Sequence, residues 1–152
     1  MIQLLPIKQT VEANAAFVNN PDCADTLQIT IDYFNRIGYT PPWVGYYASM
    51  NGMIVGSAAY KGKPVNSKIE IAYGTMPQHR QRGIGTAICK ALVDLALQSD
   101  PCVIITARTL PGNNYSTRIL QKNHFRLSGT VIDPEDGEVW EWEYERHPLN
   151  AS

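Results

Sequence analysis

The sequence predicts an α/β domain of the α+β kind, in which a mixed, mostly antiparallel sheet of about six or seven strands is flanked by about four helices. Three observations predict it. Apolar runs of strand length alternate with helical patterns, an Asn51-Gly52 pair separates two of those runs, and apolar residues recur at helical spacing from position 84 to position 96. The length of 152 residues suits one domain, which we expect to span residues 1–152.

The composition excludes several classes of protein. Apolar residues make up 44% of the chain and charged residues 18%, which rules out disordered, collagen-like and coiled-coil proteins. The net charge of -1 gives no overall positive field, so we expect no nucleic-acid partner. No apolar run reaches the ~20 residues of a membrane span, and the N-terminus lacks the basic region of a signal peptide. We therefore expect a cytoplasmic protein with no membrane partner.

The cysteines indicate neither a disulfide framework nor a metal site. Cys23, Cys89 and Cys102 are scattered, and no C-x-x-C pair is present. An odd number of cysteines favours a reducing compartment. We expect no metal.

The first third of the chain predicts one strand and two helices. Residues 2–7 form an apolar run of strand length. Thr10 is a candidate N-cap for a short helix whose apolar face holds Val11, Ala15 and Val18. A second helix is expected from about Ala24 to Ile37, and Gly38 is its stop signal. Its apolar residues at helical spacing are Leu27, Ile31 and Phe34.

The middle of the chain predicts a hairpin, a further strand and the main helix. Asn51-Gly52 supplies the two positive-φ residues of a type I′ turn between the runs 43–50 and 53–60. Residues 68–75 alternate as a strand does, with Ile69, Ile71 and Tyr73 on one side. A helix over about 83–98 has the clearest amphipathic pattern in the sequence. Its apolar face consists of Ile84, Ala87, Ile88, Ala91, Leu92, Leu95 and Ala96.

The last third predicts a strand, a short helix and a closing hairpin. The continuous apolar run 102–106 is typical of a strand buried on both faces. A short helix is expected at roughly 114–123, and strands are expected at 126–132 and 138–146. Trp140, Trp142 and Tyr144 share one face of the last strand. That face can pack into the core, which we prefer, or against a second subunit, so we expect a monomer or a homodimer.

The segment from Arg80 to Thr86 indicates a diphosphate-binding site. A helix N-terminus offers about four unbonded N–H groups and about half a positive charge. Gly83 and Gly85 allow an anion to approach those groups, and Arg80 and Arg82 add positive charge. Simple packing of a glycine-rich helix start, beside a solvated basic face, is the alternative interpretation.

Two common phosphate-binding motifs do not fit this segment. The P-loop needs a lysine after its second glycine, and no lysine follows either glycine here. The dinucleotide fingerprint needs a third glycine at the position of Ile88.

The spacing Arg80-x-x-Gly83-x-Gly85 instead resembles the [QR]-x-x-G-x-[GA] signature of the GCN5-related N-acetyltransferases, the GNAT superfamily, which bind the pyrophosphate of acetyl-CoA on this loop. Residues 113–125 resemble the later family segment N-x-x-S-x-x-(V/I)-L-x-K-x-G-F. Residues 133–144 resemble the closing hairpin of the branch that contains the ribosomal-protein N-terminal acetyltransferases. The likeness extends from about residue 68 to residue 144.

The resemblance implies that acetyl-CoA is the cosubstrate and lies where the strand before the loop diverges from the next one. Main-chain groups of Thr75 and Met76 would bond its pantetheine amides, Asn113 would bond the pantetheine arm, and Ser116 would lie near the sulfur. The residues that would bind the pyrophosphate are Arg80, Gln81, Arg82, Gly83, Ile84, Gly85 and Thr86. By residue type alone, Asn113 can instead cap the following helix, and Ser116 can bond local backbone.

Acetyl transfer to an amine also needs a base, because amines in proteins have pKa values of ~8 to ~10.4. The resemblance makes Glu70 the leading candidate, because family members often direct a glutamate at this position toward the acceptor. Pairing with a neighbouring surface lysine is the alternative. Glu141 and Glu143 are secondary candidates, for which a solvated strand face is the alternative.

Two positions depart from the family pattern. Many members have a tyrosine acid where this chain has Leu120, so Ser116 is expected to stabilise the leaving thiolate, with Tyr115 as a weaker substitute. His124 replaces the family's glycine, and we interpret it as a structural variant rather than a catalyst.

The sequence thus predicts an acetyl-CoA-dependent N-acetyltransferase that acts on a primary amine, either a protein N-terminus or a small molecule, by direct attack in a ternary complex. A non-catalytic acyl-CoA-binding or sensor module is the alternative, because the tyrosine acid is missing. Aromatic residues are candidates for an acceptor wall, although core packing is the alternative for most: Tyr33, Phe34, Tyr39, Trp43, Tyr46 and Tyr47. No acidic cluster in the sequence marks a polyamine site.

Overall fold

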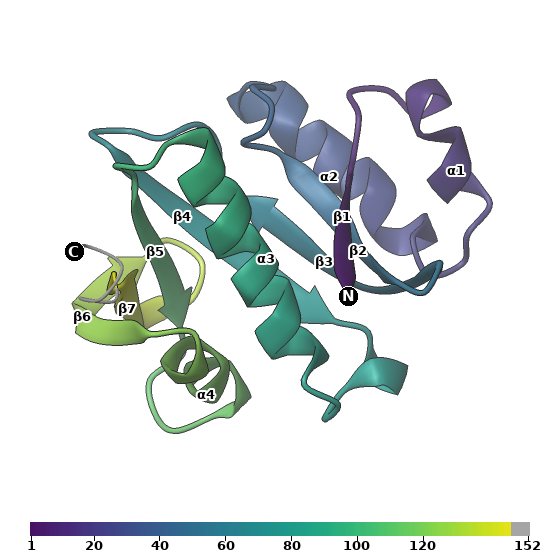
Figure 1. The fold of residues 1–152 in the computed structure, drawn as a ribbon. Helices are drawn as coiled ribbons and strands as arrows, with labels where there is room; N and C mark the ends of the chain where they lie inside the picture. The colour runs from purple at the N-terminus through teal and green to yellow at the C-terminus, as the bar shows by residue number, and fades with distance from the viewer. Residues whose placement is uncertain (147–152) are drawn as a thin grey trace.

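The computed structural model describes residues 1–146, so positions 147–152 of the expected domain lie outside the described residues. The elements follow the chain as β1 (Ile2–Pro6), a 3-10 helix (Glu12–Asn14), α1 (Ala15–Val18), α2 (Ala24–Ile37), β2 (Gly45–Met50), β3 (Met53–Tyr60), β4 (Lys68–Thr75), a second 3-10 helix (Pro77–His79), α3 (Ile84–Ser99), β5 (Ile104–Thr109), α4 (Tyr115–Lys122), β6 (Phe125–Asp133) and β7 (Gly137–Tyr144) (Figure 1).

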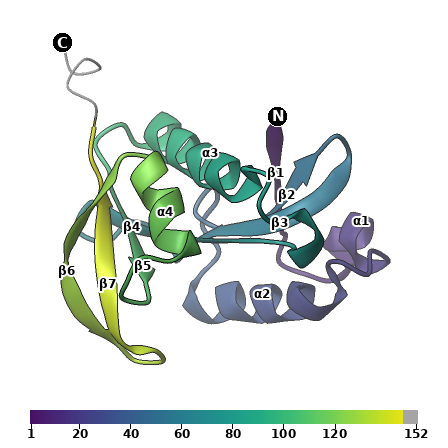
Figure 2. The ribbon, with the colours of Figure 1, turned by 90° about the horizontal axis from the view of Figure 1, so that it is seen from below.

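The strands form one seven-stranded sheet in the order β1-β2-β3-β4-β5-β7-β6. Every neighbouring pair is antiparallel except β4 and β5, which pair in parallel. The helix α2 covers one face of the sheet, whereas α3 and α4 lie on the opposite face (Figure 2). The predicted fold class is therefore confirmed. Within residues 1–146, no helix combines the length and the apolar character needed to cross a membrane.

Two local predictions are confirmed residue by residue. The helix expected at Ala24–Ile37 is α2, and it ends at Gly38 with a φ of 112°. Asn51 and Gly52, with φ values of 54° and 79°, connect β2 to β3 as the turn chemistry predicts. Both features depend on one or two residues that tolerate positive φ, which is why the sequence alone defines them.

The predicted face of the first short helix is wrong. Val11, Ala15 and Val18 are exposed, whereas Asn14 and Phe17 are buried. The Asn14 side chain accepts a hydrogen bond from the Lys8 N–H and donates to the carbonyls of residues 8 and 10, at 2.8–3.0 Å. Because these bonds satisfy a polar side chain in the interior, an apolar pattern does not reveal this face.

The predicted strand 102–106 is also shifted and is not buried on both faces. It is β5, Ile104–Thr109, and Cys102 before it is exposed. Ile105, Ala107 and Thr109 are buried, and the residues between them are half-buried. On the half-buried face, Arg108 lines an open cavity instead of packing against a helix.

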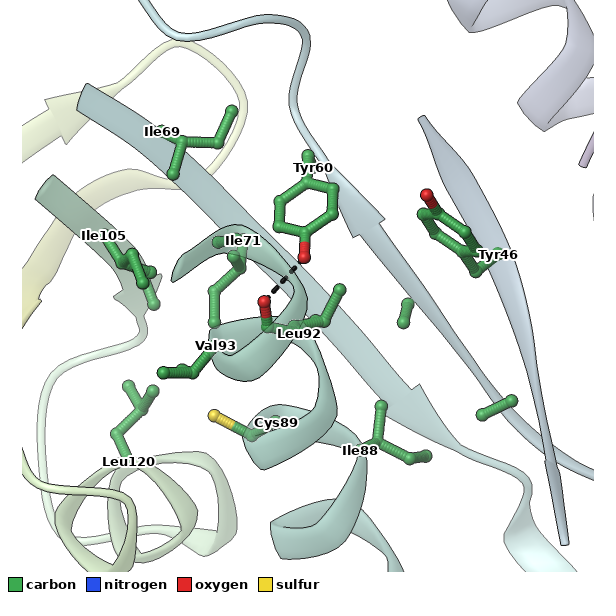
Figure 3. Close-up of a cluster of buried hydrophobic side chains, with 14 of the residues drawn as sticks. Tyr46, Tyr60, Ile69, Ile71, Ile88, Cys89, Leu92, Val93, Ile105 and Leu120 are labelled. Atoms are coloured by element: carbon green, nitrogen blue, oxygen red, sulfur yellow. Dashed lines mark hydrogen bonds between the residues drawn. The ribbon is translucent and has the colours of Figure 1, made fainter. Parts of the chain in front are cut away.

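The hydrophobic core lies between the sheet and α3. The helix buries Ile88, Cys89, Leu92 and Val93, which pack with isoleucines from β4 and β5 (Figure 3). Each such side chain contributes about 1.5–3 kcal/mol when fully buried. The Tyr60 hydroxyl on β3 donates to the Leu92 carbonyl at 2.5 Å and joins helix to sheet.

The tryptophan face of β7 packs into this core, as we preferred. Trp142 is 3% exposed, and Trp140 and Tyr144 are partly buried against the same cluster. The Trp142 indole N–H donates to Thr109 Oγ1 at 2.9 Å. The face therefore closes the β5–β7 side of the molecule.

Candidate active site

The strands β4 and β5 diverge in the middle of the sheet. Their parallel pairing runs from Lys68 with Ile104 to Ile71 with Ala107. Beyond that last pair, β4 continues to Thr75 and β5 to Thr109 without pairing to each other. The sheet is therefore open between residues 72–75 and the end of β5.

The ladder between β3 and β4 determines which main-chain groups of β4 face this opening. The Lys61 N–H donates to the Glu70 carbonyl at 2.9 Å, and the Met76 N–H donates to the Val55 carbonyl at 2.8 Å. Because alternate residues of an antiparallel ladder bond to the same neighbour, Tyr73 and Thr75 direct their main-chain groups toward β5. The main-chain groups of Thr75 therefore face the opening.

Met76 is less available than its place in the motif suggests. Its N–H is bonded to β3, and its carbonyl accepts the His79 N–H at 2.9 Å. Tyr73, which the sequence analysis assigned only to a strand face, is the better source of main-chain groups on the open edge. The alternation of β4 places Tyr73 two residues from Thr75, so the strand pattern contains the signal that finds it.

A groove of about 490 Å³ lies beside the opening. It is formed by the end of β4, the loop before α3 and the first turns of α4. Its lining residues are Tyr73, Gly74, Thr75, Arg80, Gln81, Tyr115, Ser116, Arg118 and Ile119. The Oγ1 atom of Thr75 is buried and has no hydrogen-bond partner among residues 1–146.

The loop residues Arg80 and Gln81, which line this groove, lead into the start of α3, which has no side-chain cap. Its N-cap is Gly83, with a φ of 74°, and the first backbone bond of the helix runs from the Ala87 N–H to the Gly83 carbonyl at 3.1 Å. The N–H groups of residues 84–86 precede that bond and have no partner inside the helix. Arg80, Gln81 and Arg82 are exposed beside them. The geometry therefore offers backbone donors and positive charge at one point.

The two glycines of the motif differ in their structural role. A Cβ atom at Gly83 would meet nothing within 4 Å, so the positive φ is what favours glycine there. A Cβ atom at Gly85 would lie 2.7 Å from Ile119 Cδ1 and 3.1 Å from both Thr75 Oγ1 and the Tyr115 hydroxyl. Gly85 is therefore required for the close approach of α3 to β4 and α4.

The start of α4 also differs from the expectation. Asn114, not Asn113, is the N-cap, and it forms a capping box in which its side chain accepts the Thr117 N–H at 3.0 Å. Asn113 is exposed and does not line the groove. Tyr115 and Ser116 both line it, and Ser116 also borders a second cavity.

This second cavity, of about 260 Å³, lies at the base of the strand opening. Its lining residues are Lys61, Glu70, Ile71, Ala72, Tyr73, Ala107, Arg108, Thr109, Leu110, Ser116, Asp133, Asp136 and Val139. Three carboxylates lie around Arg108, and one of them also pairs with a lysine. Arg108 lies 3.8 Å from Glu70, 3.2 Å from Asp133 and 3.6 Å from Glu141, and Lys61 lies 3.2 Å from Glu70.

The acidic character of this cavity was not predicted. Glu70 comes from β4 and Asp133 from the end of β6, and both line the cavity, whereas Glu141 of β7 lies beside it against Arg108. These carboxylates meet because β5 pairs with both β4 and β7. Arg108 lies on β5 within a largely apolar segment that gave no functional signal. The other secondary candidate, Glu143, pairs with Arg126 at 3.2 Å outside the cavity, as a surface strand residue does.

The surroundings shift the pKa values of Arg108 and Asp133. Burial of Arg108 disfavours its charge, but Glu70, Asp133 and Glu141 outweigh that effect and raise the pKa of its guanidinium above the usual value. The N–H groups of residues 135 and 136, followed by Arg108, lower the pKa of the Asp133 carboxyl. Arg108 is therefore a fixed cation that holds the carboxylates around it.

Tyr73 has a buried phenol that stays protonated. Burial raises its pKa, and its interactions with Cys89 and Tyr115 act in the same direction. The residue borders the groove, the second cavity and a third, mostly apolar cavity of about 290 Å³ on the α2 face of the sheet. Tyr73 thus lies where the three cavities approach one another.

The expected aromatic acceptor wall is mostly core. Tyr46 and Tyr47 line the third cavity. Phe34 and Trp43 are buried in the main core, and Tyr33 and Tyr39 pack against it.

The two departures from the family motif have structural explanations. Leu120 is fully buried and points toward Cys89 and Val93 in the core (Figure 3). His124 has a φ of 67°, a conformation that glycine adopts without strain, so the position requires a particular backbone shape.

Comparisons with known proteins agree with this geometry. Residues 6–126 match the acetyltransferase (GNAT) domain family. A Bacillus subtilis (strain 168) protein named "Putative ribosomal N-acetyltransferase YdaF" is 28% identical over 128 residues, which cover 77% of this chain. The matched part spans about two thirds of that relative, 65% of its length.

Three solved structures share the fold of this chain at low sequence identity. The aminoglycoside acetyltransferase AAC(6′)-Ib with coenzyme A has a TM-score of 0.70 at 21% identity, covering 100% of this chain and 99% of its own. RimL, the ribosomal L7/L12 alpha-N-protein acetyltransferase, with coenzyme A has a TM-score of 0.67 at 16% identity, covering 93% and 92%. A Vibrio cholerae spermidine N-acetyltransferase chimera (SpeG with hSSAT) has a TM-score of 0.69 at 10% identity, covering 94% of each.

The family match includes the diverging strands, the basic loop and the uncapped start of α3, which are the features that build the groove. The chain belongs to the acetyltransferase (GNAT) family.

Proposed function

We propose that the chain, acting as one domain, is an N-acetyltransferase that moves the acetyl group of acetyl-CoA to a primary amine by direct attack. One observation carries the proposal: the groove is lined by Arg80 and Gln81, the loop residues just before the uncapped start of α3, and by the open edge of β4. A diphosphate suits the first feature, and the amides of a pantetheine arm suit the second.

Acetyl-CoA would bind with its pyrophosphate at residues 80–86 and its pantetheine arm along the opening. N–H groups of Gly83, Ile84, Gly85 and Thr86 would donate to the pyrophosphate. Tyr73 and Thr75 would exchange main-chain hydrogen bonds with the pantetheine amides, as a neighbouring strand does. Met76 and Asn113 would contribute less to binding the pantetheine arm, because the Met76 N–H is bonded to β3 and Asn113 lies outside the groove.

The reaction would take place where the groove meets the acidic cavity. Glu70 would accept a proton from the incoming ammonium, directly or through water, and the neutral amine would attack the thioester carbonyl carbon. Backbone N–H groups on the open edge of β4 would stabilise the developing oxyanion. Ser116, which borders both cavities, would donate a hydrogen bond to the departing thiolate, with Tyr115 as the weaker substitute.

The acidic cavity favours a cationic acceptor. A primary amine is protonated near neutral pH, and the carboxylates around Arg108 attract it to Glu70. The names of the relatives and fold neighbours refer to amine acceptors of several kinds, namely ribosomal proteins, aminoglycosides and spermidine. We propose the class, a protein N-terminus or a small amine, and no single member of it.

Calorimetric titration with acetyl-CoA tests the binding step. Arg82→Glu should weaken affinity about 10–100-fold, because a charged hydrogen bond contributes about 1.5–3 kcal/mol. Arg36→Glu, an exposed arginine on α2 at the opposite face of the sheet, is the matched charge control and should bind normally. No binding by a folded wild-type sample would refute the proposal.

Thiol release with a panel of amines tests the chemical step. Glu70→Gln should lower turnover by about 10²–10⁴-fold with little change in acetyl-CoA affinity, because only the proton acceptor is lost. Wild-type turnover in this variant would remove Glu70 from the role of base.

A non-catalytic acyl-CoA-binding module is the second candidate. The observation that favours it is Leu120, which is sealed in the core where many relatives have a tyrosine acid. Tight acetyl-CoA binding without turnover of any amine in the panel would favour this candidate over the enzyme.

A further inference from the structure

One lysine of the chain lies beside the proposed base. Lys61 is the first residue after β3, and its main-chain N–H donates to the Glu70 carbonyl at 2.9 Å. Its ammonium lies 3.2 Å from the Glu70 carboxylate, and its side chain is 43% exposed. The loop that follows turns at Gly62, with a φ of 93°. Lys61 therefore combines a main chain bonded to β4 with a long, partly exposed side chain that ends at Glu70.

The same lysine lines the cavity where the proposed reaction would take place. Lys61 shares this cavity with Ala72 and Tyr73, at the point where β4 leaves β5, and with Ser116. Among the residues that line the cavity, Lys61 is the one that carries an amine. Its position relative to Glu70 is the position that an external acceptor amine would have to take.

We propose that Lys61 is itself an acetyl acceptor, so that the protein acetylates its own Lys61 from bound acetyl-CoA. This inference rests on the proposed function. The Lys61 ammonium gives a proton to Glu70, and the neutral Nζ attacks the thioester carbonyl carbon. The new N–C bond forms as the C–S bond breaks, and the thiolate leaves as the thiol after taking up a proton. The products are Nε-acetyl-lysine and free coenzyme A, and Glu70 passes its proton to water.

The proximity of amine and base makes this lysine different from the others. A lysine held inside the site reacts as an intramolecular acceptor, which replaces a bimolecular encounter. Lys63 lies two residues further along the same loop, is exposed, and forms no ion pair among the described residues. It therefore provides a matched control for simple chemical reaction of surface lysines with the thioester.

The test is a time course of acetylation by peptide mass spectrometry on purified protein incubated with acetyl-CoA. We expect Lys61 to gain an acetyl group before any other lysine, at a rate per chain that does not depend on protein concentration. Lys61→Arg keeps the cation beside Glu70 and should show no acetylation at this position, whereas Lys63→Arg should be modified at Lys61 as the wild type is. Glu70→Gln should slow the reaction of Lys61 to the rate of the surface lysines.

Two outcomes overturn the proposal. Equal rates of acetylation at Lys61 and Lys63 would assign the modification to direct chemical reaction with acetyl-CoA. An unmodified Lys61, in a sample that binds acetyl-CoA and turns over external amines, would refute self-acetylation and leave the proposed function intact. Calorimetry on the same sample separates these failures from the absence of acetyl-CoA binding, which would overturn both proposals.

Discussion

Replacing Gly85 with alanine tests whether this glycine serves packing or ligand approach. The new Cβ would lie 2.7 Å from Ile119 Cδ1 and 3.1 Å from both Thr75 Oγ1 and the Tyr115 hydroxyl. Ile119 is only 4% exposed, so its methyl group has little room to move. Overpacking of this kind costs about 1–3 kcal/mol. The helix propensity of alanine returns up to about 1 kcal/mol. We therefore expect a net loss of about 0.5–2 kcal/mol in the free energy of unfolding.

Urea unfolding followed by circular dichroism measures this loss, and Gly129→Ala is the matched control. Gly129 lies on β6, where an added Cβ would meet nothing within 4 Å and the backbone φ is not positive. That variant should be as stable as the wild type or slightly more stable. In thermal scans the Gly85 variant should lose about 2–4 °C for each kcal/mol.

The outcome separates two interpretations of the motif. A Gly85→Ala protein with full stability would refute the packing argument, because three close contacts would then have been relieved without cost. If that stable variant also bound acetyl-CoA poorly, close approach of the ligand would be the reason for the glycine. Destabilisation with retained binding agrees with the structure, in which Gly83, not Gly85, faces open space.

Three further predictions concern stability. Asn114→Ala should lower the free energy of unfolding by about 1 kcal/mol in urea titrations because it removes a helix cap, whereas Asn113→Ala should not. Tyr60→Phe should cost about 0.5–1.5 kcal/mol in the same assay, since the Leu92 carbonyl loses its hydroxyl donor; no change would show that this bond adds nothing. The folded-state pKa of Asp133 is lowered, so its contribution is present above the ordinary pKa of ~3.9 and is lost as the pH falls through the folded value. Across this acidic range, the free energy of unfolding of Asp133→Asn should depend less steeply on pH than that of the wild type.

The elements that were predicted well are those in which local chemistry and tertiary packing agree. In α2, the 3.6-residue period and the Gly38 stop both reflect one buried stripe, and the Asn51-Gly52 turn needs no distant partner. The prediction for the 102–106 run was wrong because only alternate residues of β5 are buried, although the run is continuously apolar. Local pattern cannot reveal which face of a strand is left uncovered.

One part of the candidate site was predicted from the sequence, and the other part was not. Its loop and helix start are contiguous in sequence, so a spacing motif finds them. The acidic cavity is assembled from β4, β5, β6 and β7, and its members are up to dozens of residues apart along the chain. Arg108 lies beside Glu141 because β5 pairs with β7, and no local sequence pattern predicts that pairing. Lys61 likewise meets Glu70 because β3 and β4 form a ladder.

The two helices beside the groove begin in opposite ways, and this contrast explains where an anion can bind. At α4, Asn114 and Thr117 satisfy main-chain groups with their side chains, so few donors remain for a ligand. At α3, the cap is a glycine, and the first-turn N–H groups stay unbonded beside two exposed arginines. A serine or asparagine cap there would change the stability of the helix by only about a few tenths of a kcal/mol relative to glycine, but would occupy a donor. The uncapped start of α3 therefore leaves donors that an anion can use, and the groove between the preceding loop and the open edge of β4 favours an anion with a long amide-bearing arm.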